Sequence, residues 1–322
     1  MLPNFSYVRP ASVNEAIKAL ASGDAHLHAG GTDLLPCLRD GVFTAKKLVS
    51  IGGIADLRGI RVLDDGRLRI GALATLTEIA EHPVVRQRYA VLAQAAQSAA
   101  SPQLRNQGTL GGNLCQRPRC WYFRGDFPCL RKGGDTCFAQ DGENEYHCIF
   151  GGNGCYMVHP SDTAPALVAL DGRARIAGPG GTRTVALDSF FVSPSEEVTR
   201  ETVLKPNEVL TEILIPPVKD LRSSYRKVRT RGSWDFALVG VAVALQLTEG
   251  HVARANIVLS GVAPVPWRAL AAAKEITGQR LDAAIISRAA AAAIKGAEPL
   301  SQNAYKVDLV HGVVQESLTA MT

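Results

Sequence analysis

The feature that most constrains this chain is a segment in which five of its seven cysteines lie within 36 residues, from Cys120 to Cys155. The segment is rich in glycine and charged side chains, which is typical of a loop. Seven is an odd number, and the N-terminus carries no export signal, which argues against a secreted disulfide framework. Metal binding, redox chemistry and buried thiols remain, and we favour metal binding.

The spacing of these cysteines bears on the kind of metal site. No two of them form a Cys-x-x-Cys pair, which weakens a zinc ribbon or a ferredoxin-type cluster, because such sites take two thiolates from one tight turn. Four well-spaced thiolates on an irregular loop can still surround an iron–sulfur cluster. Spacing alone therefore favours iron–sulfur, with zinc and free thiols as alternatives, and His147 leaves a mixed ligand set open. Basic residues that can offset the negative charge of such a cluster are Arg117, Arg119, Arg124, Arg131 and Lys132.

Composition argues against a nucleic-acid-binding protein and against a membrane-spanning one. A length of 322 residues predicts two or three domains, and 46% hydrophobic residues are enough for a buried core. The net charge of +5 is too dilute to indicate nucleic-acid binding. The longest apolar run, residues 236–245, has ten residues, whereas a membrane-spanning helix needs roughly 20.

Helix and strand patterns divide the chain into three regions without an internal repeat. Residues 1–59 form a small α/β unit, in which Ser12 and Glu15 are typical of a capped helix start. Residues 60–217 hold the cysteine segment and end at a diproline, and residues 218–322 place strands before helices. We expect strands at 26–29, 48–51, 61–63, 68–73, 173–177, 208–215, 223–229, 236–247 and 253–260. We expect helices at 12–20, 34–39, from 77, 89–100, 163–170, 268–277 and 281–295.

Two diglycine loops indicate a phosphate-bearing ligand. Residues 30–33, between a strand and a helix, leave backbone N–H groups free to approach a phosphate. Residues 109–113 offer the same free amides and the side chain of Asn113, so the two loops can clamp one dinucleotide. Neither loop matches G-x-G-x-x-G, and the absence of a Gly-Lys dipeptide excludes a P-loop. The alternative is that each diglycine only turns the chain.

Six short stretches, taken in order, resemble the FAD-binding medium subunits of the molybdenum hydroxylases over essentially the whole chain. That family includes the flavin parts of xanthine dehydrogenase and carbon monoxide dehydrogenase. The cysteine insertion, at about 115–158, is similar to a branch formed by bacterial aldehyde oxidoreductases and 4-hydroxybenzoyl-CoA reductase, and the aldehyde oxidoreductase type is the closer one. The stretches are FSYVRP at 5–10, AGGTDL at 29–34, RIGA at 69–72, QGTLGGN at 107–113, HPSD at 159–162 and GVAPVPWR at 261–268.

The resemblance implies an α+β fold of the vanillyl-alcohol-oxidase and CO-dehydrogenase flavoprotein type. Two α/β subdomains, 1–59 and 60–217, would grip FAD, and a C-terminal domain, 218–322, would cover it. Lys227 would lie near the flavin, with a solvated basic strand as the alternative. The cofactor-binding residues implied are Ala29, Gly30, Gly31, Thr32, Asp33, Leu34, Thr109, Gly111, Gly112, Asn113, Ser161, Asp162, Leu210 and Lys227.

The resemblance also implies a ligand set for a 4Fe-4S cluster. Cys148 does not match a ligand position and is expected to be a buried thiol, and ordinary packing is expected for Cys37 and Cys115. The ligands implied are Cys120, Cys129, Cys137 and Cys155.

The function implied is electron transfer within a larger oxidoreductase, with no catalytic residue on this chain. A partner subunit with 2Fe-2S clusters would deliver electrons from a molybdenum-cofactor subunit, and FAD would pass them to an external acceptor. The alternatives are the flavin subunit of an aromatic acyl-CoA reductase or of a xanthine dehydrogenase-like enzyme, and a cluster scaffold without flavin. The expected compartment is the cytoplasm, or the periplasm if a signal-bearing partner exports the folded complex.

Overall fold

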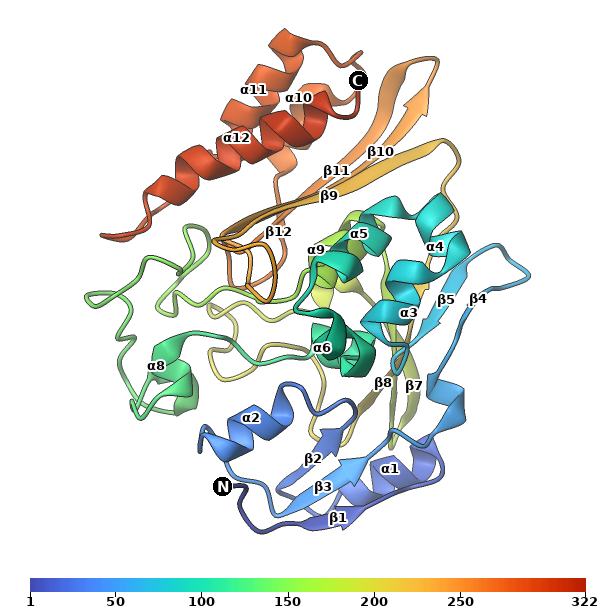
Figure 1. Ribbon diagram of the computed structural model, residues 1–322, viewed down its shortest axis with the longest axis vertical. Helices are drawn as coiled ribbons and strands as arrows, with labels where there is room; N and C mark the ends of the chain where they lie inside the picture. The colour runs from blue at the N-terminus through green and yellow to red at the C-terminus, as the bar shows by residue number, and fades with distance from the viewer.

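The computed structural model describes residues 1–322 as three β-sheets with helices packed on them. The N-terminal sheet lies at one end of the molecule and the C-terminal sheet with its helices at the other, and the largest sheet lies between them (Figure 1). The expected α+β fold class is confirmed. No helix combines the length and the apolar character needed to cross a bilayer.

The N-terminal sheet has three parallel strands in the order β1-β3-β2. Helix α1 begins where the capping pattern predicts, because the Ser12 hydroxyl accepts the Glu15 N–H at 3.2 Å. Ile17 and Leu20 of this helix are buried in a small core with strand residues. The elements of this region are β1 Ser6–Val8, α1 Val13–Leu20, β2 Ala25–His28, α2 Leu34–Arg39, β3 Lys47–Ser50 and the 3-10 turn η1 Ala55–Leu57.

The largest sheet has five antiparallel strands in the order β4-β5-β8-β6-β7. Its apolar face packs with residues of helices α3, α5 and α9 in the largest core of the molecule. The elements are β4 Ile60–Val62, β5 Leu68–Gly71, α3 Leu76–Glu81, α4 Pro83–Arg88, α5 Ala90–Ser98, α6 Pro102–Gln107, α7 Leu110–Leu114, α8 Trp121–Arg124, η2 Leu130–Lys132, α9 Thr163–Ala169, β6 Arg173–Gly178, β7 Gly181–Ala186, η3 Leu187–Ser189 and β8 Val209–Ile215.

The C-terminal sheet has the order β12-β11-β10-β9, and its strand β10 is buried on both faces. Along β10, Val241 and Val243 face the core shared with the C-terminal helices, whereas Ala242 and Ala244 face the core of the middle region. A strand between two cores is apolar at every position, which explains the uninterrupted run. The elements are β9 Leu221–Val228, β10 Val239–Thr248, β11 His251–Ser260, β12 Trp267–Arg268, α10 Leu270–Ile276, α11 Ala283–Ala293 and α12 Tyr305–Thr319.

Some elements were not predicted from the sequence. Helix α12 was not predicted because half of its buried residues are valines, which favour helix weakly, and two others are polar. Strand β7 is a polar edge strand without apolar alternation. The prediction that the second diglycine segment is a loop is wrong, because residues Leu110–Leu114 form the one-turn helix α7. The cysteine segment, by contrast, is irregular as expected, with only α8 and η2 between α7 and α9 (Figure 1).

Candidate functional site

The first glycine loop presents a row of unused hydrogen-bond donors. Between β2 and α2, none of the backbone N–H groups of residues 29–33 donates to an acceptor in the protein. Successive free amides form a concavity suited to an anion such as a diphosphate. The loop therefore has the local structure that its sequence predicts.

The two glycine loops meet backbone to backbone. A Cβ on Gly30 would overlap the carbonyl oxygen of Gln107, which precedes the second loop. Gly31 has a φ of +71°, a left-handed conformation that disfavours other residues. These two glycines are thus required by the close approach of the loops and by the turn.

The second loop differs from its expected chemistry. The N–H groups of residues 110–113 all have acceptors: the carbonyls of Ala74, Ala72 and Thr109, and the Thr109 hydroxyl, which accepts from Gly112 at 3.2 Å. The expectation that this loop offers free amides is therefore wrong, because the carbonyls of Ala72 and Ala74 and the N-cap residue Thr109 accept them.

The side chain of Asn113 remains available to a ligand. Its Oδ1 accepts the hydroxyls of Ser161 and Thr163, each at 2.6 Å, and its NH₂ group has no acceptor in the protein. These contacts orient the Asn113 amide and connect α7 to the start of α9.

Three cavities follow one another along these loops. The first, of about 250 Å³, shares Thr32, Thr109 and Gly112 with the second, of about 380 Å³. The second shares Arg119 and Asp162 with the third, of about 470 Å³. Because each cavity shares wall residues with the next, the set is elongated, as a dinucleotide site has to be.

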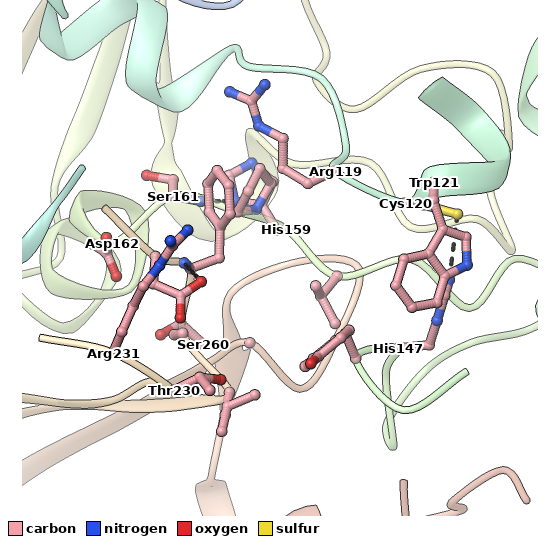
Figure 2. Close-up of a pocket in the computed structure, with 18 residues that line it drawn as sticks. Arg119, Cys120, Trp121, His147, His159, Ser161, Asp162, Thr230, Arg231 and Ser260 are labelled. Atoms are coloured by element: carbon pink, nitrogen blue, oxygen red, sulfur yellow. Dashed lines mark hydrogen bonds between the residues drawn. The ribbon is translucent and has the colours of Figure 1, made fainter. Parts of the chain in front are cut away.

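The predicted cofactor-binding residues are distributed along this set of cavities. Ser161 and Asp162 line the third cavity, where Figure 2 shows them at the end opposite Cys120, Trp121 and His147. Asn113 lines the second cavity. The first cavity is lined by Ala29, Gly30, Gly31, Thr32, Asp33, Leu34, Thr109, Gly111, Gly112 and Leu210.

Lys227 lines none of the three cavities and lies behind Asp162. Its ammonium contacts the Asp162 carboxylate at 2.8 Å, and the two side chains are only 3% and 7% exposed. The Tyr225 hydroxyl donates to the other oxygen of Asp162 at 2.8 Å, and burial followed by the Asp162 charge raises the pKa of Tyr225 well above its usual range. Burial excludes the solvated-strand alternative for Lys227, which instead orients Asp162.

Replacing Lys227 with methionine should destabilise the protein by roughly 3–5 kcal/mol, because it leaves a buried carboxylate without its cation. The matched control is Arg226→Met, which removes a side chain that is 56% exposed and paired with Glu316; it should cost at most about 1 kcal/mol. Urea unfolding followed by circular dichroism measures both. Equal stability of the two variants would contradict the role assigned to the buried pair.

The Asp33 carboxylate binds the protein itself. It accepts from Arg119 and Arg124 at 2.7 Å each and from the Arg117 N–H at 2.7 Å. Arg124 also contacts the sulfur of Cys37 at 2.7 Å. Asp33 therefore fastens the first glycine loop to the beginning of the cysteine segment, and only its backbone N–H remains for a ligand.

The four cysteines implied as cluster ligands line one small cavity of about 20 Å³, from which Cys37, Cys115 and Cys148 are absent. All seven cysteines are free thiols. Aromatic residues close this cavity, including Tyr122, Phe123 and Phe138. The structure has no group of three or more His, Cys, Asp or Glu side chains arranged to hold one metal ion. The cysteine ligands implied for a cluster are Cys120, Cys129, Cys137 and Cys155.

The thiols of the cysteine segment differ in acidity. The neighbouring Cys137 thiol and, more weakly, the Arg131 charge lower the pKa of Cys155 to about 6, against the effect of burial. Burial raises the pKa of Cys148 to about 12, and this thiol is 1% exposed. Cys148 is thus a buried thiol, as the sequence predicts, whereas Cys155 is the more acidic member of a hydrogen-bonded pair in which the pKa of Cys137 is raised.

Several residues that line the site were not assigned to it from the sequence. Arg119 and Phe236 form the wall between the second and third cavities, and the Arg119 guanidinium lies 5.2 Å from the Phe236 ring. His159 lines the third cavity, and burial lowers its pKa to about 4. These residues come from distant parts of the chain, so only the tertiary structure brings them together.

Comparisons with known proteins agree with this architecture. A family described as "FAD binding domain in molybdopterin dehydrogenase" matches residues 3–218, and one described as "CO dehydrogenase flavoprotein C-terminal domain" matches residues 223–321. The aldehyde oxidoreductase FAD-binding subunit PaoB of Escherichia coli K12 is 39% identical over 278 residues, which cover 85% of this chain and 86% of that protein.

Solved structures give the same result. A carbon monoxide dehydrogenase structure from Hydrogenophaga pseudoflava matches with a TM-score of 0.79 and 30% identity, covering 99% of this chain and 98% of that one. Quinoline 2-oxidoreductase from Pseudomonas putida 86 matches with a TM-score of 0.79 and 25% identity, covering 99% and 97%. The chain therefore belongs to the FAD-binding medium subunits of the molybdenum hydroxylases, which are subunits of oxidoreductase complexes.

Proposed function

We propose that this chain is the FAD- and 4Fe-4S-binding electron-transfer subunit of a molybdenum-dependent aldehyde oxidoreductase. The observation that carries the proposal is the cavity lined by the four implied cysteine ligands, which shares Cys120 and His147 with the third of the cavities fit for a dinucleotide. The similarity to PaoB, an aldehyde oxidoreductase subunit by name, favours aldehydes as the substrate class of the complex.

The first glycine loop fits the diphosphate of FAD. The free N–H groups of residues 29–33 would bind the phosphate oxygens. Because Gly112 has no side chain, it would let the phosphates come close to the loop. The aliphatic walls of the first cavity, which include Leu210, suit the adenine, and the two larger cavities would take the flavin end. When bound, FAD supplies the redox chemistry, while the protein binds, orients and shields it.

The cysteine segment fits a 4Fe-4S cluster by its donor set. Four free thiols line one cavity, its other walls are aromatic and aliphatic, and Arg131 supplies positive charge. The cavity is smaller than a cluster, so the walls would move outward as the cluster binds, and the segment is irregular enough to do so. The ligands would be Cys120, Cys129, Cys137 and Cys155.

The proposed domain division follows the three sheets. Strands β1–β3 fall within residues 1–59, β4–β8 within 60–217 and β9–β12 within 218–322. The FAD site would then lie among all three domains, because the first cavity uses residues of the first two and the third cavity uses β11 and the chain before β10. The cysteine insertion, about 115–158, belongs to the middle domain.

The proposed partners are a 2Fe-2S subunit and a molybdenum-cofactor subunit. Co-expression of the three chains should give a stable complex that elutes as one species in size-exclusion chromatography, carries flavin absorption on this chain and contains iron. Absence of co-elution at micromolar concentration would contradict the assembly. A complex that contains this chain but no flavin would instead favour the cluster scaffold without FAD.

A further inference from the structure

Arg131 places unused hydrogen-bond donors at the cysteine cavity. Its side chain is 1% exposed and lines the cavity beside Cys155. Nη1 contacts Glu201 at 2.9 Å and the carbonyl of Arg200 at 3.2 Å, but Nε and Nη2 are buried without a partner. Buried guanidinium N–H groups are rarely left unpaired, so these two indicate an acceptor in the cavity.

His147 places a second donor on the other side of the same cavity. Its Nε2 lies 3.3 Å from the Cys120 sulfur, the contact drawn in Figure 2, and its Nδ1 is buried without a partner. A metal-bound thiolate has only lone pairs, so it can only accept a hydrogen bond. With Cys120 as a ligand, the proton of the neutral imidazole therefore belongs on Nε2, directed at the sulfur.

The C-terminal region holds His147 in this position. The Lys306 ammonium, in a side chain that is wholly buried, donates to the carbonyls of Tyr146, His147 and Gly261 at 2.8–3.1 Å. The Asn303 amide also donates to the carbonyl of His147, at 3.1 Å. Two buried donors thus fix the backbone of His147, so its ring cannot easily turn away from Cys120.

We infer that Arg131 and His147 are potential-setting residues, which donate hydrogen bonds to the cysteine sulfurs of the cluster and raise its reduction potential. This inference rests on the proposed function, since it needs the cluster to be present. Reduction adds negative charge to a cluster, and N–H donors and a nearby cation stabilise the more negative state. Removing either donor should therefore make reduction less favourable.

The test is a potentiometric titration, monitored by low-temperature EPR, of the purified complex. His147→Phe keeps an aromatic ring among its neighbours Trp121 and Tyr122 but removes the donor. Arg131→Met keeps the length but removes the charge, and Glu201 retains its contact with Arg117 at 2.9 Å. Each variant should shift the reduction equilibrium of the cluster roughly tenfold toward the oxidised state. For one electron, this lowers the reduction potential by about 59 mV.

The controls separate this effect from a general loss of charge or structure. Lys132→Met removes the adjacent cation, whose ammonium donates to the Gly125 carbonyl and does not line the cavity, so it should leave the potential unchanged. The flavin potential, measured optically in the same samples, should not move. Should Arg131→Met lose iron, Arg131→Lys, which keeps the charge, should retain the cluster and shift its potential less.

The outcomes are distinguishable. Wild-type complex without a cluster would overturn the proposed function, and this inference with it. A cluster that is present in wild type and in both donor variants at one potential would overturn the inference alone. An equal shift in Lys132→Met would also overturn it, because the effect would then be long-range charge rather than hydrogen bonding at the sulfurs.

Discussion

Replacing Cys137 with serine should remove iron and inorganic sulfide from the protein, whereas Cys148→Ser should leave about four iron atoms per chain. Cys137 lines the small cavity, but Cys148 lies outside it as a buried, neutral thiol. The serine variants of the other three lining cysteines should behave like Cys137→Ser. Loss of the cluster should also loosen residues 120–155, because that segment has little regular structure to hold it.

Iron and sulfide analysis with EPR of the reduced variants measures the first effect, and limited proteolysis measures the second. Cys148→Ser is the matched control, since it changes a buried cysteine of the same segment. Retention of the cluster in Cys155→Ser together with its loss in Cys148→Ser would show that the fourth ligand is wrongly assigned. Zinc in place of iron would contradict the redox role of the segment.

Gly112→Val should abolish FAD binding without unfolding the chain. Gly112 lines the first and second cavities, and only the Thr109 hydroxyl, at 3.1 Å, lies near the place where a Cβ would be. The valine side chain would thus occupy space that the diphosphate needs. The displaced phosphates would lose roughly two hydrogen bonds from backbone amides, each worth about 1.5–3 kcal/mol. This loss should weaken FAD binding by about a hundredfold or more.

Flavin content after acid precipitation, normalised to protein, measures this loss, and circular dichroism checks the fold. The matched control is Gly180→Val, in the β6–β7 turn, where nothing lies within 4 Å of the added Cβ. A folded Gly112→Val protein with one FAD per chain would show that the diphosphate does not bind here. Gly31→Val is a poorer test, because its φ of +71° strains any branched residue.

Local patterns in the sequence account for much of the fold. Helix α1 follows from Ser12 and Glu15, and the apolar run of β10 from a strand buried on both faces. The sequence did not predict the elements that are stabilised mainly by packing against or pairing with other elements. Helix α12 gains its stability from the valines that it buries against β10, and β7 from pairing with β6, so neither stands out by propensity.

The first glycine loop was predictable for the same local reason. The left-handed turn requires glycine at position 31, and the free amides beside it follow from the strand-to-helix turn. The need for glycine at position 30, by contrast, comes from the carbonyl of the distant Gln107. The second loop was predicted with the wrong donors, because whether an N–H is free depends on acceptors such as the carbonyls of Ala72 and Ala74, far away in the sequence. Sequence pattern does not report those distant acceptors.

The sequence by itself determined the family, the first glycine loop and the number of candidate cysteines, since these depend on residue type and local spacing. Only the tertiary structure decided which groups meet. It set Asp33 against the arginines of the cysteine segment, placed Lys227 behind Asp162 and brought His147 to Cys120. These contacts join residues far apart in the chain, and their free energy comes from burying and pairing charge, which no local pattern encodes.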